Sequence, residues 1–307
     1  MQTGQAPAET GDVTRGRVGW IAVVLEPDDP CEAAVRWAVL EAARRHLHVQ
    51  VVLPDDHRHH VGCRKSFARA VSVARRTAPE VVLTATVIPG PVDRAGLAAS
   101  VDAQLVVLPD ASTHIAAAVT GAYCPVVVVP DLPSTPRPGR PRHSVDPYPV
   151  MVAVGPTTGS EVIEFAFAEA ESQDAGLLAI RTWHDPLIDL GAPAGRQALR
   201  WDAANAEIRA DLDHQLSLCR LAFPDVVAET LVVDDRCSDL LAAVALHARL
   251  LVFGRPTRGA LLNSVAVSPA LALSRRPPCP VTVVPPAEPA WPGWLPSRRV
   301  GVADLRG

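Results

Sequence analysis

The chain has 307 residues, of which 48% are hydrophobic and 20% are charged, and its formal net charge is −4. This length suggests two domains of about 150 residues each, and the apolar content is sufficient for a packed core in both. The chain contains no Lys/Arg-rich block, which argues against nucleic acid as a partner, and its apolar runs are too short for a membrane-spanning helix.

The first part of the chain begins with residues 1–16, which are rich in Gly, Ala and Thr and predict a disordered tail. This tail lacks the apolar core of a signal peptide, so we expect a cytoplasmic protein. Short apolar runs then alternate with segments of helical spacing, which predicts a parallel sheet with covering helices. Strands are expected at 18–25, 48–53, 80–88, 105–108 and 125–129, and helices at 31–46, 65–78, 91–101 and 115–122.

A Pro-rich segment at 131–147 predicts a linker, and the same alternation restarts after it. The expected domains are therefore 17–130 and 148–286, followed by a Trp- and Pro-containing tail at 287–307. In the second domain, strands are expected at 150–154, 177–183, 226–233, 250–253 and 279–284, and helices at 160–173, 196–223, 238–247 and from 268 to the prolines at 277–278.

The two domains contain matching segments, which predicts a tandem repeat. YCPVVVVP at 123–130 matches PCPVTVVP at 278–285, with an offset of 155 residues. DAQLVVLP at 102–109 matches HARLLVFG at 247–254, with an offset of 145 residues. The ten residues that separate these offsets are missing from the first copy, between Pro109 and Ile115.

The stretch LLVFGRPTRGALLNSVAVSPALALSRRPPCPVTVVPP, at 250–286, resembles the C-terminal part of a universal stress protein domain. In that family, a strand leads into the pattern G-x2-G-x9-G-[ST], then a helix and a CPV-containing strand. Gly254 and Ser268 occupy the first and last positions of the pattern, whereas Thr257 and Val267 replace two glycines. The segments GSEVIEFAFAEA and LLAIRTW resemble tandem members of the family from actinobacteria, and the resemblance covers 18–130 and 149–285.

This resemblance implies two flavodoxin-like or Rossmann-like α/β domains, each with five parallel strands in the order 3-2-1-4-5. It also implies that the last strands of the two domains pair across a two-fold axis, which gives an intramolecular pseudo-dimer. The family's glycine pattern is a phosphate cradle, in which backbone N–H groups and a helix N-terminus face the anion. The expected nucleotide-site residues in the second domain are Gly155, Gly254, Arg255, Thr257, Arg258, Gly259 and Ser268.

The acid that ends the first strand in this family resembles a nucleoside ligand, and it differs between the two copies. Glu26 occupies its position in the first copy, and Gly155 replaces it in the second. Since the first copy also lacks the cradle, we expect no ATP binding there. Two interpretations of the second domain stay open. In one, the loop is degenerate, with Gly254 kept for a turn and Ser268 kept as a helix N-cap. In the other, the loop still binds ATP weakly.

Other chemistries have weaker support in the sequence. The cluster His57, His59 and His60 beside Cys63 matches no zinc spacing and reads as a solvated loop. Glu26 with Asp28 and Asp29 reads as a capping cluster before the helix at Cys31 rather than an acid/base pair. The six cysteines form no CxxC motif and read as reduced, small hydrophobic residues, and no nucleophile motif is present.

These observations leave three hypotheses open. The first is a non-catalytic stress-response or signalling protein with an unknown protein partner, no cofactor and no catalytic residues. The second is an ATP-binding module that uses only the second domain, with or without slow hydrolysis. The third is a metal-dependent enzyme, which requires a bound metal. None of them involves nucleic acid or a membrane, and a further homo-oligomer is compatible with each.

Overall fold

The computed structural model describes residues 19–26, 31–55, 60–131, 148–183, 194–234, 237–255 and 269–287. The expected tails and the linker lie outside these residues, apart from positions 131 and 287.

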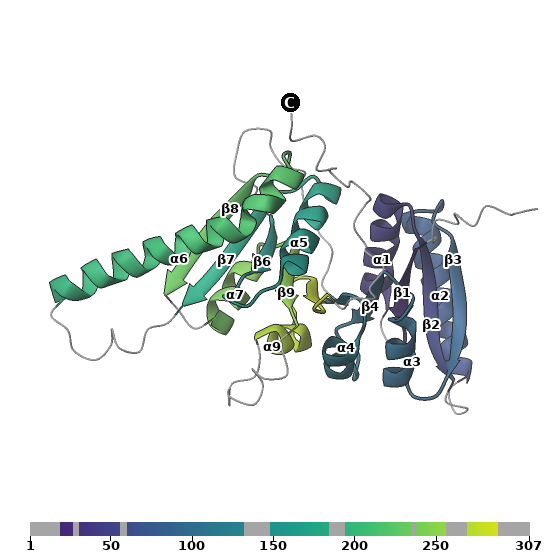
Figure 1. The fold of residues 1–307 in the computed structure, drawn as a ribbon. Helices are drawn as coiled ribbons and strands as arrows, with labels where there is room; N and C mark the ends of the chain where they lie inside the picture. The colour runs from purple at the N-terminus through teal and green to yellow at the C-terminus, as the bar shows by residue number, and fades with distance from the viewer. Residues whose placement is uncertain are drawn as a thin grey trace, which may run out of the picture.

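Ten strands form one sheet in the order β3-β2-β1-β4-β5-β10-β9-β6-β7-β8 (Figure 1). Each half of this sheet has the expected order 3-2-1-4-5, and strands within a half pair in parallel. The strands are β1 Trp20–Val24, β2 His48–Asp55, β3 Leu83–Pro89, β4 Leu105–Pro109, β5 Val126–Val129, β6 Val150–Ala153, β7 Leu177–Trp183, β8 Ala228–Asp234, β9 Leu250–Gly254 and β10 Val281–Val284.

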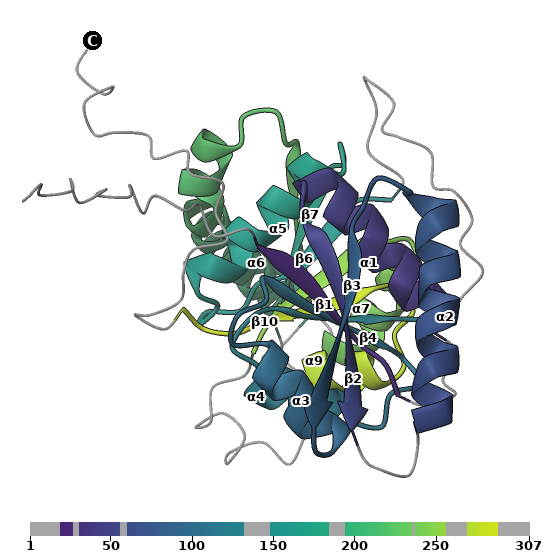
Figure 2. The same cartoon turned by 90° about the vertical axis from the view of Figure 1, so that its right-hand side faces the viewer.

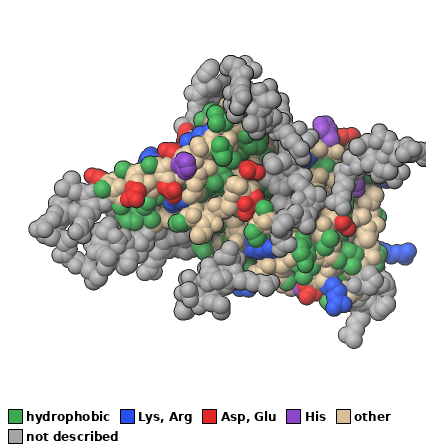
Figure 3. All heavy atoms as spheres, in the orientation of Figure 1, with side chains coloured by type: hydrophobic (Ala, Val, Ile, Leu, Met, Phe, Trp, Pro, Cys, Tyr) green, Lys and Arg blue, Asp and Glu red, His purple; other side chains and the backbone are tan. Residues whose placement is uncertain are grey.

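Helices cover both faces of the sheet, which explains why its central strands are apolar on both sides (Figures 1 and 2). One face packs against α1 Glu32–Arg45, α2 His60–Thr77, α5 Ser160–Ser172 and α6 Ala194–Ala222. The other packs against α3 Val92–Ala99, α4 Ile115–Gly121, α7 Cys237–Ala245 and α9 Pro269–Arg275. On the molecular face drawn in Figure 3, acidic and basic side chains are scattered among apolar ones.

The helix α2 begins earlier than the sequence predicts. It starts at His60 rather than Lys65, so the prediction of a solvated loop is wrong for His60. The buried positions Gly62, Ser66 and Ala70 are four residues apart and continue one helix face toward the sheet. Packing of this face outweighs the cost of about 1 kcal/mol for glycine in a helix. His57 and His59 lie outside the described residues.

The two halves meet at a central seam, where β5 and β10 pair in antiparallel orientation as predicted. Val127 lies opposite Thr282, with Val126 opposite Val283 and Val128 opposite Val281. All five valines and Thr282 are buried. We call β1–β5 with α1–α4 the first half, and β6–β10 with α5, α6, α7 and α9 the second half. Pairing of their last strands leaves neither apolar strand as an exposed sheet edge.

Candidate functional site

In the first half, the carboxylate of Glu26 is held by the loop between β4 and α4. Its Oε1 accepts hydrogen bonds from the Ser112 hydroxyl at 2.8 Å and from the Thr113 backbone N–H at 3.0 Å. The Thr113 hydroxyl also lies 3.2 Å from Oε2. Ser112 and Thr113 therefore already hydrogen-bond to part of the carboxylate that the family resemblance assigns to a nucleoside.

This arrangement corrects the expectation that Glu26 belongs to a capping cluster before α1. The cap residue Cys31 makes no side-chain cap hydrogen bond, and the Glu26 carboxylate is directed to the β4–α4 loop instead. Ser112 and Thr113 offer one N–H and two hydroxyl donors at the same carboxylate, and charge-assisted hydrogen bonds of this kind are strong. Asp28 and Asp29 lie outside the described residues.

The β4–α4 loop is tight because only residues 110–114 separate the two elements. The Asp110 N–H donates to the Val129 carbonyl at 3.0 Å, and the Ser112 N–H donates to the Pro109 carbonyl at 3.1 Å. Two backbone N–H groups of this loop therefore donate to carbonyls within the protein. In the second half, residues 255–268 separate β9 from α9, so only this half has the length for a phosphate cradle.

A cavity of about 290 Å³ lies at the carboxyl ends of β6, β7 and β9 in the second half. This is the position at which ligands bind in open α/β sheets. Its size is near the lower limit of small-molecule sites, which span about 300–1,000 Å³. The described lining residues carry no titratable side chain; they are Ala153, Val154, Gly155, Thr158, Ile180, Thr182, Leu241, Phe253, Gly254, Pro269 and Ala270.

Gly155 stands at the rim of this cavity, and its backbone is fixed by two side chains. Its N–H donates to the Thr158 hydroxyl at 2.8 Å, and its carbonyl accepts from Arg181 Nη2 at 3.2 Å. Arg181 also donates to the Val154 carbonyl at 3.1 Å and forms an ion pair with Asp211 of α6. A Cβ added at Gly155 would lie 3.7 Å from the Thr158 hydroxyl, an ordinary contact, so the site has room for the start of a side chain here.

Gly254 ends β9 beside the helix α5. A Cβ at this position would lie 3.2 Å from Cγ2 of Val162, closer than most contacts in proteins. Close packing of strand against helix is therefore sufficient reason for glycine here, whether or not a phosphate binds.

The side chain of Arg255 is directed across the seam to the first half. Its Nη1 donates to the Ala122 carbonyl at 2.6 Å and lies 3.4 Å from the Thr120 carbonyl. Both carbonyls belong to the C-terminal end of α4, where a cation is favourable. Arg255 thus joins the two halves, a role that the sequence did not predict.

The remaining expected site residues lie outside the described part of the chain: Thr257, Arg258, Gly259 and Ser268, with Val267. Pro269 is the first residue of α9, as predicted from the preference for proline at this position.

Sequence reasoning did not identify Ser112, Thr113, Thr158 or Arg181. Arg181 had a signal, because it is a single charged residue within the apolar strand LLAIRTW. The three hydroxyl residues lie in short loops and had no comparable pattern.

Among the described residues, no group of three or more His, Cys, Asp and Glu side chains could hold a metal ion. The same part of the chain contains no helix that is both long and apolar enough to cross a membrane. Four described cysteines, at 31, 124, 219 and 279, are buried. Burial raises the pKa of Cys124 to about 12, so its thiol is not a ready nucleophile.

The family model described as "Universal stress protein family" matches residues 148–285. A curated universal stress protein of Mycobacterium tuberculosis (strain H37Rv) is 34% identical over 175 residues, which is 55% of this chain and 53% of that protein. A second one from this strain is 29% identical over 143 residues, 45% of this chain and 43% of that protein. The chain thus spans about half the length of these relatives.

Solved structures show the fold at lower sequence identity. A universal stress protein from Archaeoglobus fulgidus aligns with a TM-score of 0.57 and 11% identity, covering 88% of this chain and 100% of that one. A putative universal stress protein from Pseudomonas aeruginosa aligns with a TM-score of 0.59 and 16% identity, covering 87% and 93%.

Proposed function

We propose that this chain, which belongs to the universal stress protein family through its second half, is a non-catalytic stress-response or signalling protein with one closed and one degenerate nucleotide site. The observation that carries this proposal is the bonding of Glu26 to Ser112 and Thr113. The described residues that line the second-half cavity carry no titratable side chain, which favours a binding role over a catalytic one.

The first half is the closed site. A nucleoside hydroxyl would have to displace hydrogen bonds that Glu26 already makes within the protein, and each charge-assisted bond contributes roughly 1.5–3 kcal/mol. The five-residue loop after β4 also replaces the cradle that would bind phosphates. Both features favour loss of nucleotide binding in this half.

The second half is the degenerate site. Its cavity has a size suited to the nucleoside part of ATP, and the segment 255–268 between β9 and α9 has the length of the family's cradle. Gly155 supplies no carboxylate, and Arg255 bonds to the first half rather than extending freely toward a phosphate. Loss of one charged hydrogen bond would weaken binding about 10- to 100-fold.

The cavity also favours a second candidate function, an ATP-binding module that uses only this half. The described cavity lining has the hydroxyls of Thr158 and Thr182 as its polar side-chain groups. Neither is a general base, so the described residues offer no route to rapid hydrolysis. Cytoplasmic location, the protein partner and further homo-oligomers stay predictions.

Titration calorimetry of the full chain with ATP and Mg²⁺ tests the proposal. We expect at most one weak site per chain and a 10- to 100-fold gain for Gly155→Asp, because the Cβ has room and the carboxylate restores the lost acceptor. Asp110→Asn, which changes an acid near the closed site, is the control. Two sites per chain, or tight binding by the wild type that Gly155→Asp does not improve, would contradict the degenerate-site reading.

A further inference from the structure

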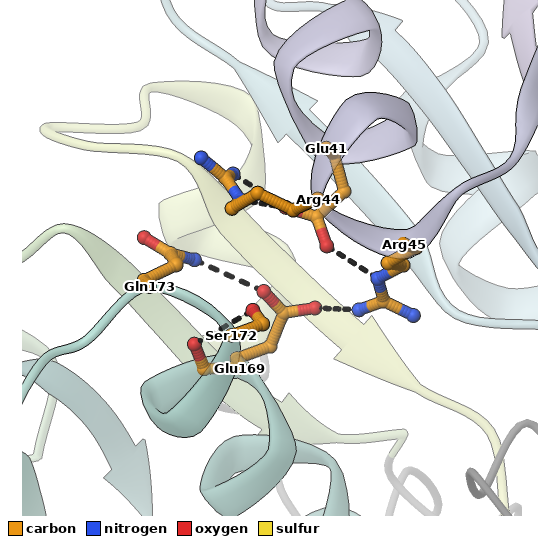
Figure 4. Close-up of polar contacts among 6 residues, drawn as sticks. All are labelled: Glu41, Arg44, Arg45, Glu169, Ser172 and Gln173. Atoms are coloured by element: carbon orange, nitrogen blue, oxygen red, sulfur yellow. Dashed lines mark hydrogen bonds and ion pairs between the residues drawn. The ribbon is translucent and has the colours of Figure 1, made fainter.

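A cluster of charged and polar side chains around two buried carboxylates joins α1 to α5 across the seam (Figure 4). The carboxylates of Glu41 and Glu169 have no exposed surface, and the Arg45 guanidinium forms ion pairs with both. Arg44 donates to Glu41 at 2.5 and 3.2 Å, and Gln173 donates to Glu169 at 3.0 Å. Each carboxylate is therefore bonded from its own half, and Arg45 alone connects the halves within this cluster.

The two helices hold equivalent places in their halves, since α1 follows β1 and α5 follows β6. At a constant offset of 128 residues, Glu41 corresponds to Glu169, and Arg45 corresponds to Gln173. Arg44 corresponds to Ser172 at the same offset, and the Ser172 hydroxyl donates to the Glu169 backbone carbonyl. The carboxylate is thus present in both halves, whereas the cations are present only in the first.

The charges that meet at the seam depend on which halves are paired. With both carboxyls ionised, the cluster residues give the first half a charge of +1 and the second half a charge of −1. Pairing the first half with the second gives zero. Pairing the first half with another first half would place an excess of +2 at the seam, and two second halves would place two carboxylates there without a cation.

We propose that this cluster selects a second half as the partner of the first half and disfavours the pairing of two like halves. Paired strands and apolar contacts alone would not discriminate, because β5 and β10 are nearly the same sequence, VVVV and VTVV. An uncompensated buried charge is strongly unfavourable, and like charges that face each other oppose the wrong pairing.

Moving the arginine from position 45 to position 173 tests whether the cluster selects the partner half or only stabilises α1. Arg45→Gln makes the first half neutral, so the native seam has an excess of −1 while a pair of first halves becomes neutral. Gln173→Arg makes the second half neutral in the same way. The double variant Arg45→Gln/Gln173→Arg makes every pairing neutral, so it should recover the native seam but lose the selection.

Full-length variants are compared at pH 8 by thermal unfolding and by capture of untagged chain on a tagged copy. Capture is measured at about 0.1–1 mM chain, approaching the effective concentration of linked halves. Arg45→Gln should lower Tm by about 6–10 °C and increase capture at least threefold. The double variant should return to within about 3 °C of the wild-type Tm and still capture more than the wild type. Arg75→Gln, an exposed arginine of α2, is the matched control.

Glu169→Gln tests the same selection without removing an arginine, because it also makes a pair of second halves neutral. It should increase capture even if Arg45→Gln does not fold. The proposal is overturned if the double variant is as unstable as the sum of its single changes. It is equally overturned if none of the folded variants captures more chain than the wild type.

Discussion

The buried carboxyl of Glu169 should make the stability of the chain decrease as pH rises through neutrality. Burial and the nearby charge of Glu41 raise the pKa of Glu169 to about 7, against the opposing effect of Arg45. The folded state then holds a proton that the unfolded state releases near pH 4.5. Stability from this group is therefore fully present below pH 4.5 and is lost as pH rises through about 7.

The shift from 4.5 to about 7 corresponds to roughly 3 kcal/mol, at 1.36 kcal/mol per pKa unit. Glu41 does not cancel this effect in the same range. Burial opposes its ionisation, but Arg45 and Arg44 outweigh burial and lower the pKa of Glu41 below 4.5. Its contribution is present above pH 4.5 and is lost only as pH falls through the lowered value.

Urea unfolding of wild type and Glu169→Gln at pH 5, 6, 7 and 8 measures the effect. We expect the wild type to lose about 2–3 kcal/mol relative to the variant between pH 5 and pH 8, because glutamine cannot release a proton. Glu171→Gln, which replaces an exposed carboxylate on the same helix, should follow the wild type. If the free energies of unfolding of wild type and Glu169→Gln run parallel from pH 5 to pH 8, the reasoning about Glu169 is wrong.

Three further substitutions test the seam and the cavity rim. Thr282→Val should raise the free energy of unfolding by about 1 kcal/mol in urea titrations, because the buried Thr282 hydroxyl has no hydrogen-bond partner among the described residues. The control Thr77→Val should lower the free energy of unfolding, because it removes the hydrogen bond from the Thr77 hydroxyl to the Val73 carbonyl. Val127→Lys should place an unpaired charge in the core beside the β5–β10 pair and cause aggregation or separation of the halves, and an unchanged Tm and hydrodynamic radius would contradict this. Gly254→Ala should lower Tm by about 2–4 °C through contact with Val162, and Val162→Ala in the same chain should reduce that difference.

The strands and helices could be predicted largely from the sequence because their signals are local. Apolar runs, breakers and the repeat offsets gave the strands, and the family resemblance gave the order 3-2-1-4-5 and the β5–β10 pairing. The contacts of Glu26 and Arg255 could not be predicted in this way. Glu26 bonds to residues 86 and 87 positions away, and Arg255 bonds to residues 133 and 135 positions away, so sequence spacing carries no information about either.

The buried cluster was missed for a different reason. Glu41 lies within the apolar helix pattern at 31–46, and a charged residue there reads as exposed unless a partner is known. Arg44 and Arg45 follow it at helical spacing, which marks a local ion pair but not its burial. Only the antiparallel pairing of β5 with β10 brings Glu169 to the same place.

The seam and the second-half cavity are connected through one residue. Gly254 lines the cavity, and the next residue, Arg255, donates its backbone N–H to Val284 of β10 at 2.8 Å and its guanidinium to the Ala122 carbonyl of the first half. The segment proposed to bind phosphates therefore follows a residue that is held by the other half. The first half thus helps to position the rim of the second-half cavity, whether or not it binds nucleotide itself. This contact gives a physical reason for the second-half cavity to depend on the first half.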